Sequence, residues 1–142
     1  MKLREVIQFE SDLPDGAVET DDGKDFVVWP ARPVTEALRG VLIGLGCEAD
    51  EIVSVDFKGW EFDFRYRGRN LWCRATQIHR YVGYFVDHGF WPKVVGGQSR
   101  IYVELLGRLN EALAKDERFR DVQWYDRATF DPEADGAPNP VD

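Results

Sequence analysis

The fold of this chain is decided by residues 53–76, which read VSVDFKGWEFDFRYRGRNLWCRAT. Apolar and polar side chains alternate in three consecutive runs within this stretch. Alternation with a period of two is typical of strands that bury one face. The pairs Lys58-Gly59 and Gly68-Arg69 separate the runs and favour two-residue hairpin turns. The stretch therefore predicts a three-stranded antiparallel meander.

The two turns also predict which side chains of the meander lie opposite each other. The expected apolar pairs are Phe57–Trp60, Val55–Phe62, Val53–Phe64, Tyr66–Leu71, Phe64–Cys73 and Phe62–Ala75. One face of the meander is then wholly apolar and must be covered by other elements. The other face carries charged side chains and Trp72, with Asp63 expected directly opposite Arg74.

Elements on either side of the meander complete the predicted fold. Pro33 suits the first turn of a helix, and apolar side chains recur at helical spacing from there to Gly46. A second amphipathic helix is expected after Ser99, as far as Leu113. Further strands are expected at residues 2–9, 26–29, 81–87 and 121–125. The order β-β-α-β-β-β-β-α-β predicts an α+β two-layer sandwich, a mainly antiparallel sheet with two helices packed on one face.

The length of 142 residues fits one domain, expected over residues 1–127. Within it, residues 10–25 form an acidic loop, and residues 128–142 are expected to be a flexible tail rich in proline and acidic residues. The sequence contains no apolar run that could span a bilayer and no secretory signal pattern. Two cysteines, Cys47 and Cys73, are too few for a disulfide scaffold, so we expect a cytoplasmic protein.

Charge is divided unevenly along the chain. The 26 acidic and 18 basic side chains give a net charge of −8. Residues 58–100 contain eight basic and three acidic side chains, a local charge of +5, so the remainder of the chain carries −13. The same window holds ten of the nineteen aromatic residues. These two regions predict two different kinds of interaction surface.

The acidic surface supports our preferred functional hypothesis. Its candidate partner-binding residues near the N-terminus are Asp12, Asp15, Glu19, Asp21, Asp22 and Asp25. Dense acidic segments commonly serve solubility alone, but they also recruit basic proteins by long-range attraction. Small immunity proteins, nuclease inhibitors, nucleic-acid mimics and secretion chaperones share this size and charge, although no motif identifies any of them. We expect a non-enzymatic protein that neutralises or escorts a partner protein with a basic surface.

The basic and aromatic window supports an alternative hypothesis, a module that binds single-stranded nucleic acid. Its candidate binding residues are Arg65, Arg67, Trp72, Arg74, Phe90 and Trp91. Arginines that follow phosphates and aromatic rings that stack on bases form such surfaces. However, most aromatic residues of the meander are expected in the core, and the net charge repels polyanions. Nucleic acid is therefore the less favoured partner, and these residues also suit a protein interface.

A third hypothesis is a small enzyme or ligand-binding domain around His79, Asp87 and His88. Two histidines and a carboxylate can act as an acid–base pair or hold a metal ion. Their spacing matches no known metal or catalytic motif. We therefore assign no catalytic residue, metal site or cofactor from the sequence. The oligomeric state stays open.

Overall fold

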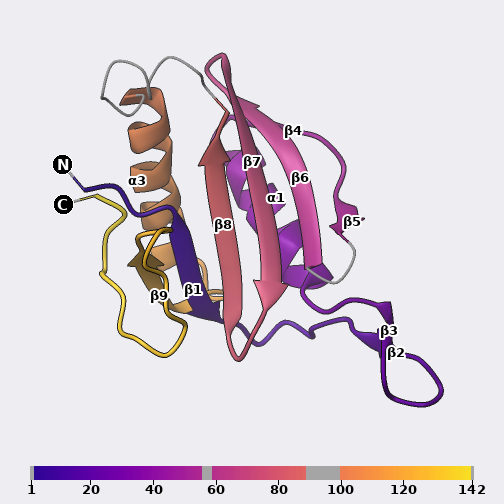
Figure 1. Ribbon diagram of the computed structural model, residues 1–142. Helices are drawn as coiled ribbons and strands as arrows, with labels where there is room; N and C mark the ends of the chain where they lie inside the picture. Colours follow the sequence, from indigo (N-terminus) through magenta and orange to yellow (C-terminus); the bar gives the residue numbers. More distant parts are fainter. Residues whose placement is uncertain (1, 56–58, 89–99, 142) are drawn as a thin grey trace.

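The computed structural model describes residues 2–55, 59–88 and 100–141. Within these residues, seven strands form the main sheet and two helices pack against it (Figure 1). The strands of the main sheet are Val6–Glu10 (β1), Glu48–Ala49 (β4), Val53–Val55 (β5), Gly59–Tyr66 (β6), Arg69–Gln77 (β7), Tyr81–Asp87 (β8) and Arg120–Tyr125 (β9). The helices are Arg32–Gly44 (α1) and Arg100–Ala114 (α3), and a separate small sheet pairs Val18–Glu19 (β2) with Phe26–Val28 (β3). The predicted α+β class is confirmed.

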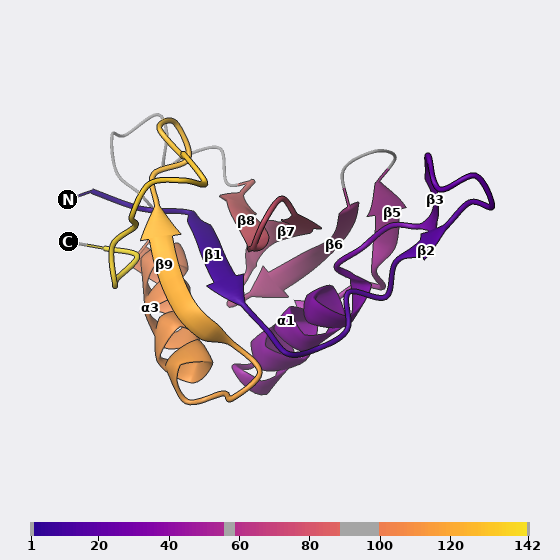
Figure 2. The same cartoon turned by 90° about the horizontal axis from the view of Figure 1, so that it is seen from below.

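The strands of the main sheet follow the order β4-β6-β7-β8-β1-β9, and β5 also pairs with β6. All of these pairings are antiparallel. The N-terminal strand β1 thus lies inside the sheet, between β8 and β9, whereas β3 pairs with β2 and, among the described strands, with no other. Figure 2 shows both helices on one side of the sheet. The opposite side is called the outer face below.

The register of the β6–β7 hairpin differs from the predicted one by two residues. Tyr66 pairs with Arg69, so Arg67 and Gly68 form the turn. Both turn residues have positive φ, 49° and 83°, as a type I′ turn requires. A shift of two residues leaves every side chain on its predicted face, because strand side chains alternate with a period of two. On the outer face, Glu61 rather than Asp63 therefore lies opposite Arg74.

The pairing of β5 with β6 differs from the predicted one by an odd number of residues. Side chains of β5 that were expected on the core face therefore lie on the outer face, and the reverse. Val53 pairs with Glu61 and Ser54 with Trp60, rather than Val53 with Phe64. Val53 consequently lies on the outer face, where 53% of it is exposed. The prediction that β5 buries its valines was wrong. Lys58, which belongs to the predicted turn, and Phe57, the predicted partner of Trp60, lie outside the described residues.

The core lies between the sheet and the helices. The apolar face of β6 and β7 is buried as predicted, through Trp60, Phe62, Phe64, Tyr66, Leu71, Cys73 and Ala75. The helices cover this face with side chains at helical spacing, chiefly Val34, Leu38 and Leu42 of α1 and Leu105, Leu106, Leu109 and Leu113 of α3. Both helices and the strands at 81–87 and 121–125 are confirmed to within a residue or two.

The strand β1 is buried on both of its faces. Val6 and Gln8, on the outer face, are 0% and 2% exposed. The cover comes from residues 126–141, here called the C-terminal segment. The Gln8 side-chain amide donates hydrogen bonds to the Tyr125 hydroxyl and to the carbonyl of Pro132. Our prediction of a flexible tail concerns motion and stays a prediction, but these contacts place the segment against the sheet.

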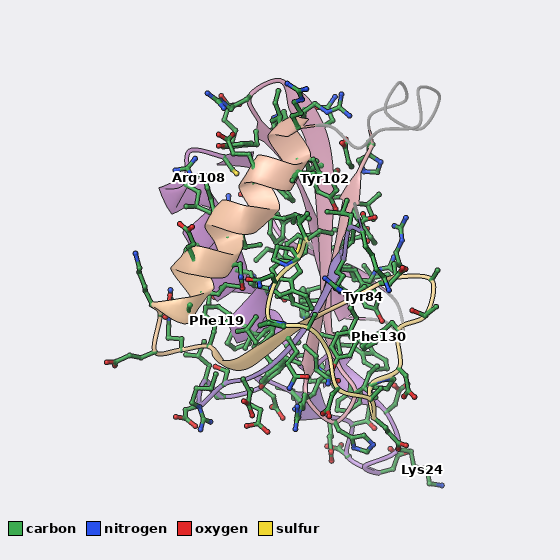
Figure 3. All side chains as sticks on the ribbon, turned by 90° about the vertical axis from the view of Figure 1, so that its left-hand side faces the viewer. Lys24, Tyr84, Tyr102, Arg108, Phe119 and Phe130 are labelled. Carbon is green, nitrogen blue, oxygen red and sulfur yellow. The ribbon has the colours of Figure 1, made fainter. Side chains whose placement is uncertain are left out.

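The C-terminal segment follows a definite path. It crosses the outer face, where the ring of Phe130 packs edge-on against Tyr84 (Figure 3). It then returns along β9, where Ala137 forms a bridge with Trp124, and the Asn110 side chain of α3 donates to the carbonyl of Pro138. The segment therefore divides the outer face into a covered part over β1 and an open part over β6 and β7.

Candidate functional site

A hairpin formed by residues 18–28, here called the arm, projects from the body of the molecule (Figure 1). We predicted residues 10–25 as a loop, and the structure places the two-residue strand β2 within it. The arm's turn is held by its own hydrogen bonds. Asp22 accepts one from the Thr20 hydroxyl (2.6 Å) and one from the backbone N–H of Lys24 (3.0 Å). At the arm's base, the Trp60 indole N–H donates to the carbonyl of Trp29 (3.0 Å).

Four of the predicted acidic residues lie on this arm and are exposed to solvent. They are Glu19, Asp21, Asp22 and Asp25. Across the described parts of the chain, none of the four carboxylates lies within ion-pair distance of a cation. Hydrogen bonds from Thr20 and Lys24 lower the pKa of Asp22. The tip of the arm therefore carries a concentrated negative charge that no ion pair with the described residues neutralises.

The arm also exposes apolar side chains beside this charge. Val18 is 49% exposed and Val27 is 68% exposed. Figure 3 shows the lone cation of the arm, Lys24, at the extremity of the molecule. Apolar contact area and charge on one projecting hairpin are the two components that protein interfaces combine.

The other two predicted acidic residues lie between β1 and the arm. Asp12 forms an ion pair with Arg120 of β9 (2.7 Å). Asp15 accepts a hydrogen bond from the backbone N–H of Ala17 (2.9 Å). Asp12 is thus partly neutralised, whereas Asp15 lies in water next to the base of the arm.

The predicted arginines of the sheet are placed differently, because each is paired with carboxylates of its own chain. Arg65 pairs with Asp50 (2.9 Å) and Glu48 (3.6 Å), Arg67 with Glu104 (2.7 Å), and Arg74 with Glu61 (3.2 Å). Hydrogen bonds from Arg65 lower the pKa of Asp50. Three of these four acids lie outside residues 58–100. The local charge of +5 in the sequence is therefore largely cancelled in the folded chain.

Trp72 lies on the outer face, as predicted, and is held between two charged groups. Its indole N–H donates to the Glu61 carboxylate (3.1 Å), and the guanidinium of Arg74 lies 4.8 Å from its ring centre. Trp72 and Arg74 line an open groove of about 420 Å³ together with Ile78, Tyr84, Val86 and Arg127. Sequence reasoning missed Arg127, because nothing in its neighbourhood along the chain connects it with β7. Phe90 and Trp91 lie outside the described residues, so their role stays a prediction.

The structure does not bring the three candidate catalytic residues together. His79 lies in the turn before β8 and His88 directly after it, and a seven-residue strand spans roughly 20 Å. Asp87 accepts hydrogen bonds at both carboxylate oxygens from Arg69 (2.9 and 2.8 Å). Within the described residues, no group of three His, Cys, Asp or Glu side chains could hold a metal ion.

Both cysteines are free and buried. Burial raises the pKa of Cys47 to about 11, although the nearby Arg108 acts in the opposite direction. Burial in the core raises the pKa of Cys73 further. A nucleophilic cysteine requires a lowered pKa and access to solvent, and neither thiol has them.

No protein-family model matches this chain, and neither a curated protein nor a solved structure matches it significantly. In the parts of the chain that the structure describes, no helix has the length and apolar character needed to cross a bilayer. Function must therefore be argued from the geometry of the arm and of the outer face.

Proposed function

We propose that this chain is a non-enzymatic protein that binds a partner with a basic surface through the arm, and so neutralises or escorts that partner, as inhibitor and immunity proteins do. The observation that carries this proposal is the state of the arm's carboxylates. Glu19, Asp21, Asp22 and Asp25 have no cationic partner among the described residues, whereas the candidate arginines of the sheet are paired with carboxylates.

Charges without an ion-pair partner on a projecting element suit the binding of another protein better than they suit stabilisation of the fold. Charges that already form ion pairs contribute little to the field at a distance, while unpaired ones of the same sign attract an oppositely charged partner and accelerate its association. The turn of the arm is fixed by the hydrogen bonds of Asp22, so little conformational entropy is lost when the arm docks. The exposed Val18 and Val27 then contribute apolar contact.

The arm alone is small for a stable complex. Standard interfaces bury about 800 Å² on each partner, which is more than one short hairpin can supply. The neighbouring connection with Asp15 extends the acidic surface from the arm towards the body of the molecule. We propose that the partner contacts both. The two free, buried cysteines suit a reducing compartment, so we place this function in the cytoplasm.

Binding of single-stranded nucleic acid is less well supported. A phosphate backbone would have to compete with Asp50, Glu104 and Glu61 for the sheet arginines. It would also meet the exposed Asp63, which lies opposite Trp72 in the sheet. Tight binding to nucleic acid requires cations that are available to phosphates, because the affinity comes from release of their counterions.

The test is a pull-down from nuclease-treated lysate with three versions of the full chain. The wild type is compared with an arm variant, Asp21→Lys with Asp25→Lys, and with a control variant of equal charge change, Glu111→Lys with Glu117→Lys. Both control residues are exposed, on or just after α3. We expect a basic protein to bind the wild type and the control, to elute with rising salt, and to be lost from the arm variant.

The partner's affinity would then be measured at several salt concentrations. Loss of the arm charges should reduce both the association rate and its salt dependence. Equal weakening by the arm and control variants would show that only net charge matters, and would contradict a docking role for the arm. Retention of no protein by the wild type would also contradict it.

A further inference from the structure

The groove on the outer face is separate from the arm and has a different chemistry. Its floor is formed by neighbouring strands, since Trp72 pairs with Val86 and Arg74 with Tyr84 in the β7–β8 register. Ile78, directly after β7, is 49% exposed and extends the apolar floor. The volume of about 420 Å³ falls within the range of ligand-binding clefts.

One wall of the groove belongs to the C-terminal segment. Phe130 packs edge-on against Tyr84, with ring centres 6.1 Å apart, and this contact fixes the segment against β8 (Figure 3). Arg127, from the same segment, is exposed and lines the groove. The C-terminal segment therefore supplies Arg127 to a groove whose other lining residues lie on or beside β7 and β8.

The two arginines of the groove differ in whether they form an ion pair with a described residue. Arg74 is paired with Glu61, which also accepts the indole hydrogen bond of Trp72. Arg127 forms no ion pair with any described residue. The groove thus combines a fixed aromatic and aliphatic floor with one positive charge that is not neutralised.

We propose that this groove binds a short segment of a partner protein that presents an apolar side chain next to one carboxylate. The apolar side chain would cover Tyr84, Val86 and Ile78, and the carboxylate would pair with the guanidinium of Arg127. Trp, Tyr and Arg are the residues that contribute most to protein interfaces, and Glu61 holds Trp72 and Arg74 in place before binding. A single carboxylate matches Arg127, the groove arginine that has no ion-pair partner among the described residues.

Other ligand chemistries fit the groove less well. A polyanion would be repelled by Glu61 and by the exposed Asp63 opposite Trp72. A cationic segment would place its charge near Arg127. The proposal does not depend on the arm, because none of the groove residues belongs to it.

Short synthetic peptides can test this proposal with the full chain. The probes are acetyl-Gly-Phe-Glu-Gly-amide and its analogues with Gln or Lys in place of Glu. Binding is followed by NMR through the indole N–H signal of Trp72, which is identified by its loss in Trp72→Phe. We expect a saturable shift of this signal with the Glu peptide at millimolar concentrations. The Gln peptide should bind about fivefold more weakly, as expected for loss of one solvent-accessible ion pair.

Two charge reversals provide the matched comparison. Arg127→Glu should abolish the preference for the Glu peptide over the Lys peptide. Lys115→Glu, an equal charge change at an exposed site after α3, should leave that preference unchanged. The arm variant Asp21→Lys with Asp25→Lys should also leave it unchanged, which separates this proposal from that for the arm. An unshifted Trp72 signal with every peptide, or equal binding of the Glu and Lys peptides, would overturn the proposal.

Discussion

The arm and the outer face of the sheet both carry charged side chains, but these form ion pairs on the outer face, while the acidic ones of the arm have no ion-pair partner among the described residues. On the outer face, arginines form ion pairs with carboxylates of other segments, as Arg65 of β6 does with Asp50 (2.9 Å). On the arm, Asp21 and Asp25 project into water without a described cationic partner. The difference arises because the sheet brings several elements together, while the arm pairs only with itself. Charge counted along a sequence is therefore a poor guide to the charge that a partner meets.

The largest effect on stability is expected from removing one partner of an ion pair on the sheet. The side chains of Arg69 and Asp87 are 22% and 10% exposed. Asp87→Ala leaves the Arg69 guanidinium without this carboxylate in a mostly buried place, and should lower the free energy of unfolding by about 2 to 3 kcal/mol. Urea denaturation followed by circular dichroism measures this.

The control for this prediction is an exposed ion pair on α1, Arg32 with Glu36. Glu36→Ala should cost less than about 0.5 kcal/mol, because exposed pairs are screened by water. If both substitutions had the same small effect, the sheet pairs would be as dispensable as surface charges, and the contrast with the arm would disappear.

The next largest effect concerns the C-terminal segment that covers part of the outer face. Phe130 is half-buried and packs edge-on against Tyr84 and Tyr125. Phe130→Ala should destabilise the fold by about 2 kcal/mol, less than for a fully buried phenylalanine. Val27→Ala on the arm, measured by the same urea titration, should have almost no effect. An unchanged midpoint for Phe130→Ala would support the flexible tail that we predicted from composition.

A smaller effect on stability is expected at alkaline pH. It concerns Tyr102, on the helix side of the sheet. The Tyr102 hydroxyl donates a hydrogen bond to Glu5 (2.8 Å), and burial raises its pKa well above the usual value of 10.0. The unfolded chain releases this proton near pH 10 while the folded chain retains it. The contribution of Tyr102 to stability is therefore complete below pH 10 and is lost as the pH rises towards the folded-state pKa.

Tyr102→Phe tests this prediction. It should cost about 1 kcal/mol at pH 7 through the lost hydrogen bond. It should also make the decline of the urea midpoint above pH 10 shallower than in the wild type. Tyr81, Tyr84 and Tyr125 also have raised pKa values, so some decline should persist. Parallel pH curves for the two proteins would show that Tyr102 is not the titrating group.

The smallest effect is expected on the arm itself. Asp21→Asn with Asp25→Asn should leave the urea midpoint unchanged, because these carboxylates have no ion-pair partner among the described residues to lose. Asp22 is kept in this variant because it accepts the hydrogen bonds that hold the turn. A loss of stability comparable to that of Asp87→Ala would mean that the arm carboxylates are structural, and would remove the basis of the proposed function.

The errors in the predicted fold show how far local patterns reach. The β6–β7 turn was misplaced, but the resulting shift of two residues preserved both faces, so the predicted core of Phe62 and Phe64 was right. The odd shift of β5 moved Val53 to the outer face. Alternation specifies which residues share a face within one strand, whereas the pairing of two strands depends on a turn that the sequence only suggests.

The candidate site was predictable to a similar extent. The acidic composition of residues 18–28 and the outward position of Trp72 follow from local sequence. The partners of the arginines, the contribution of Arg127 to the groove and the cover of β1 by Phe130 and Pro132 do not, because they join residues far apart in the chain.

The sequence by itself thus determined the α+β class, both helices, and the buried face of β6 and β7, since hydrophobic periodicity is a local property. Only the tertiary structure decided which charges are neutralised. Coulomb attraction depends on the distance between groups, and Arg67 and Glu104 become neighbours only when α3 packs beside β6. The arm keeps its charge because no other element of the described fold comes near enough to pair with it.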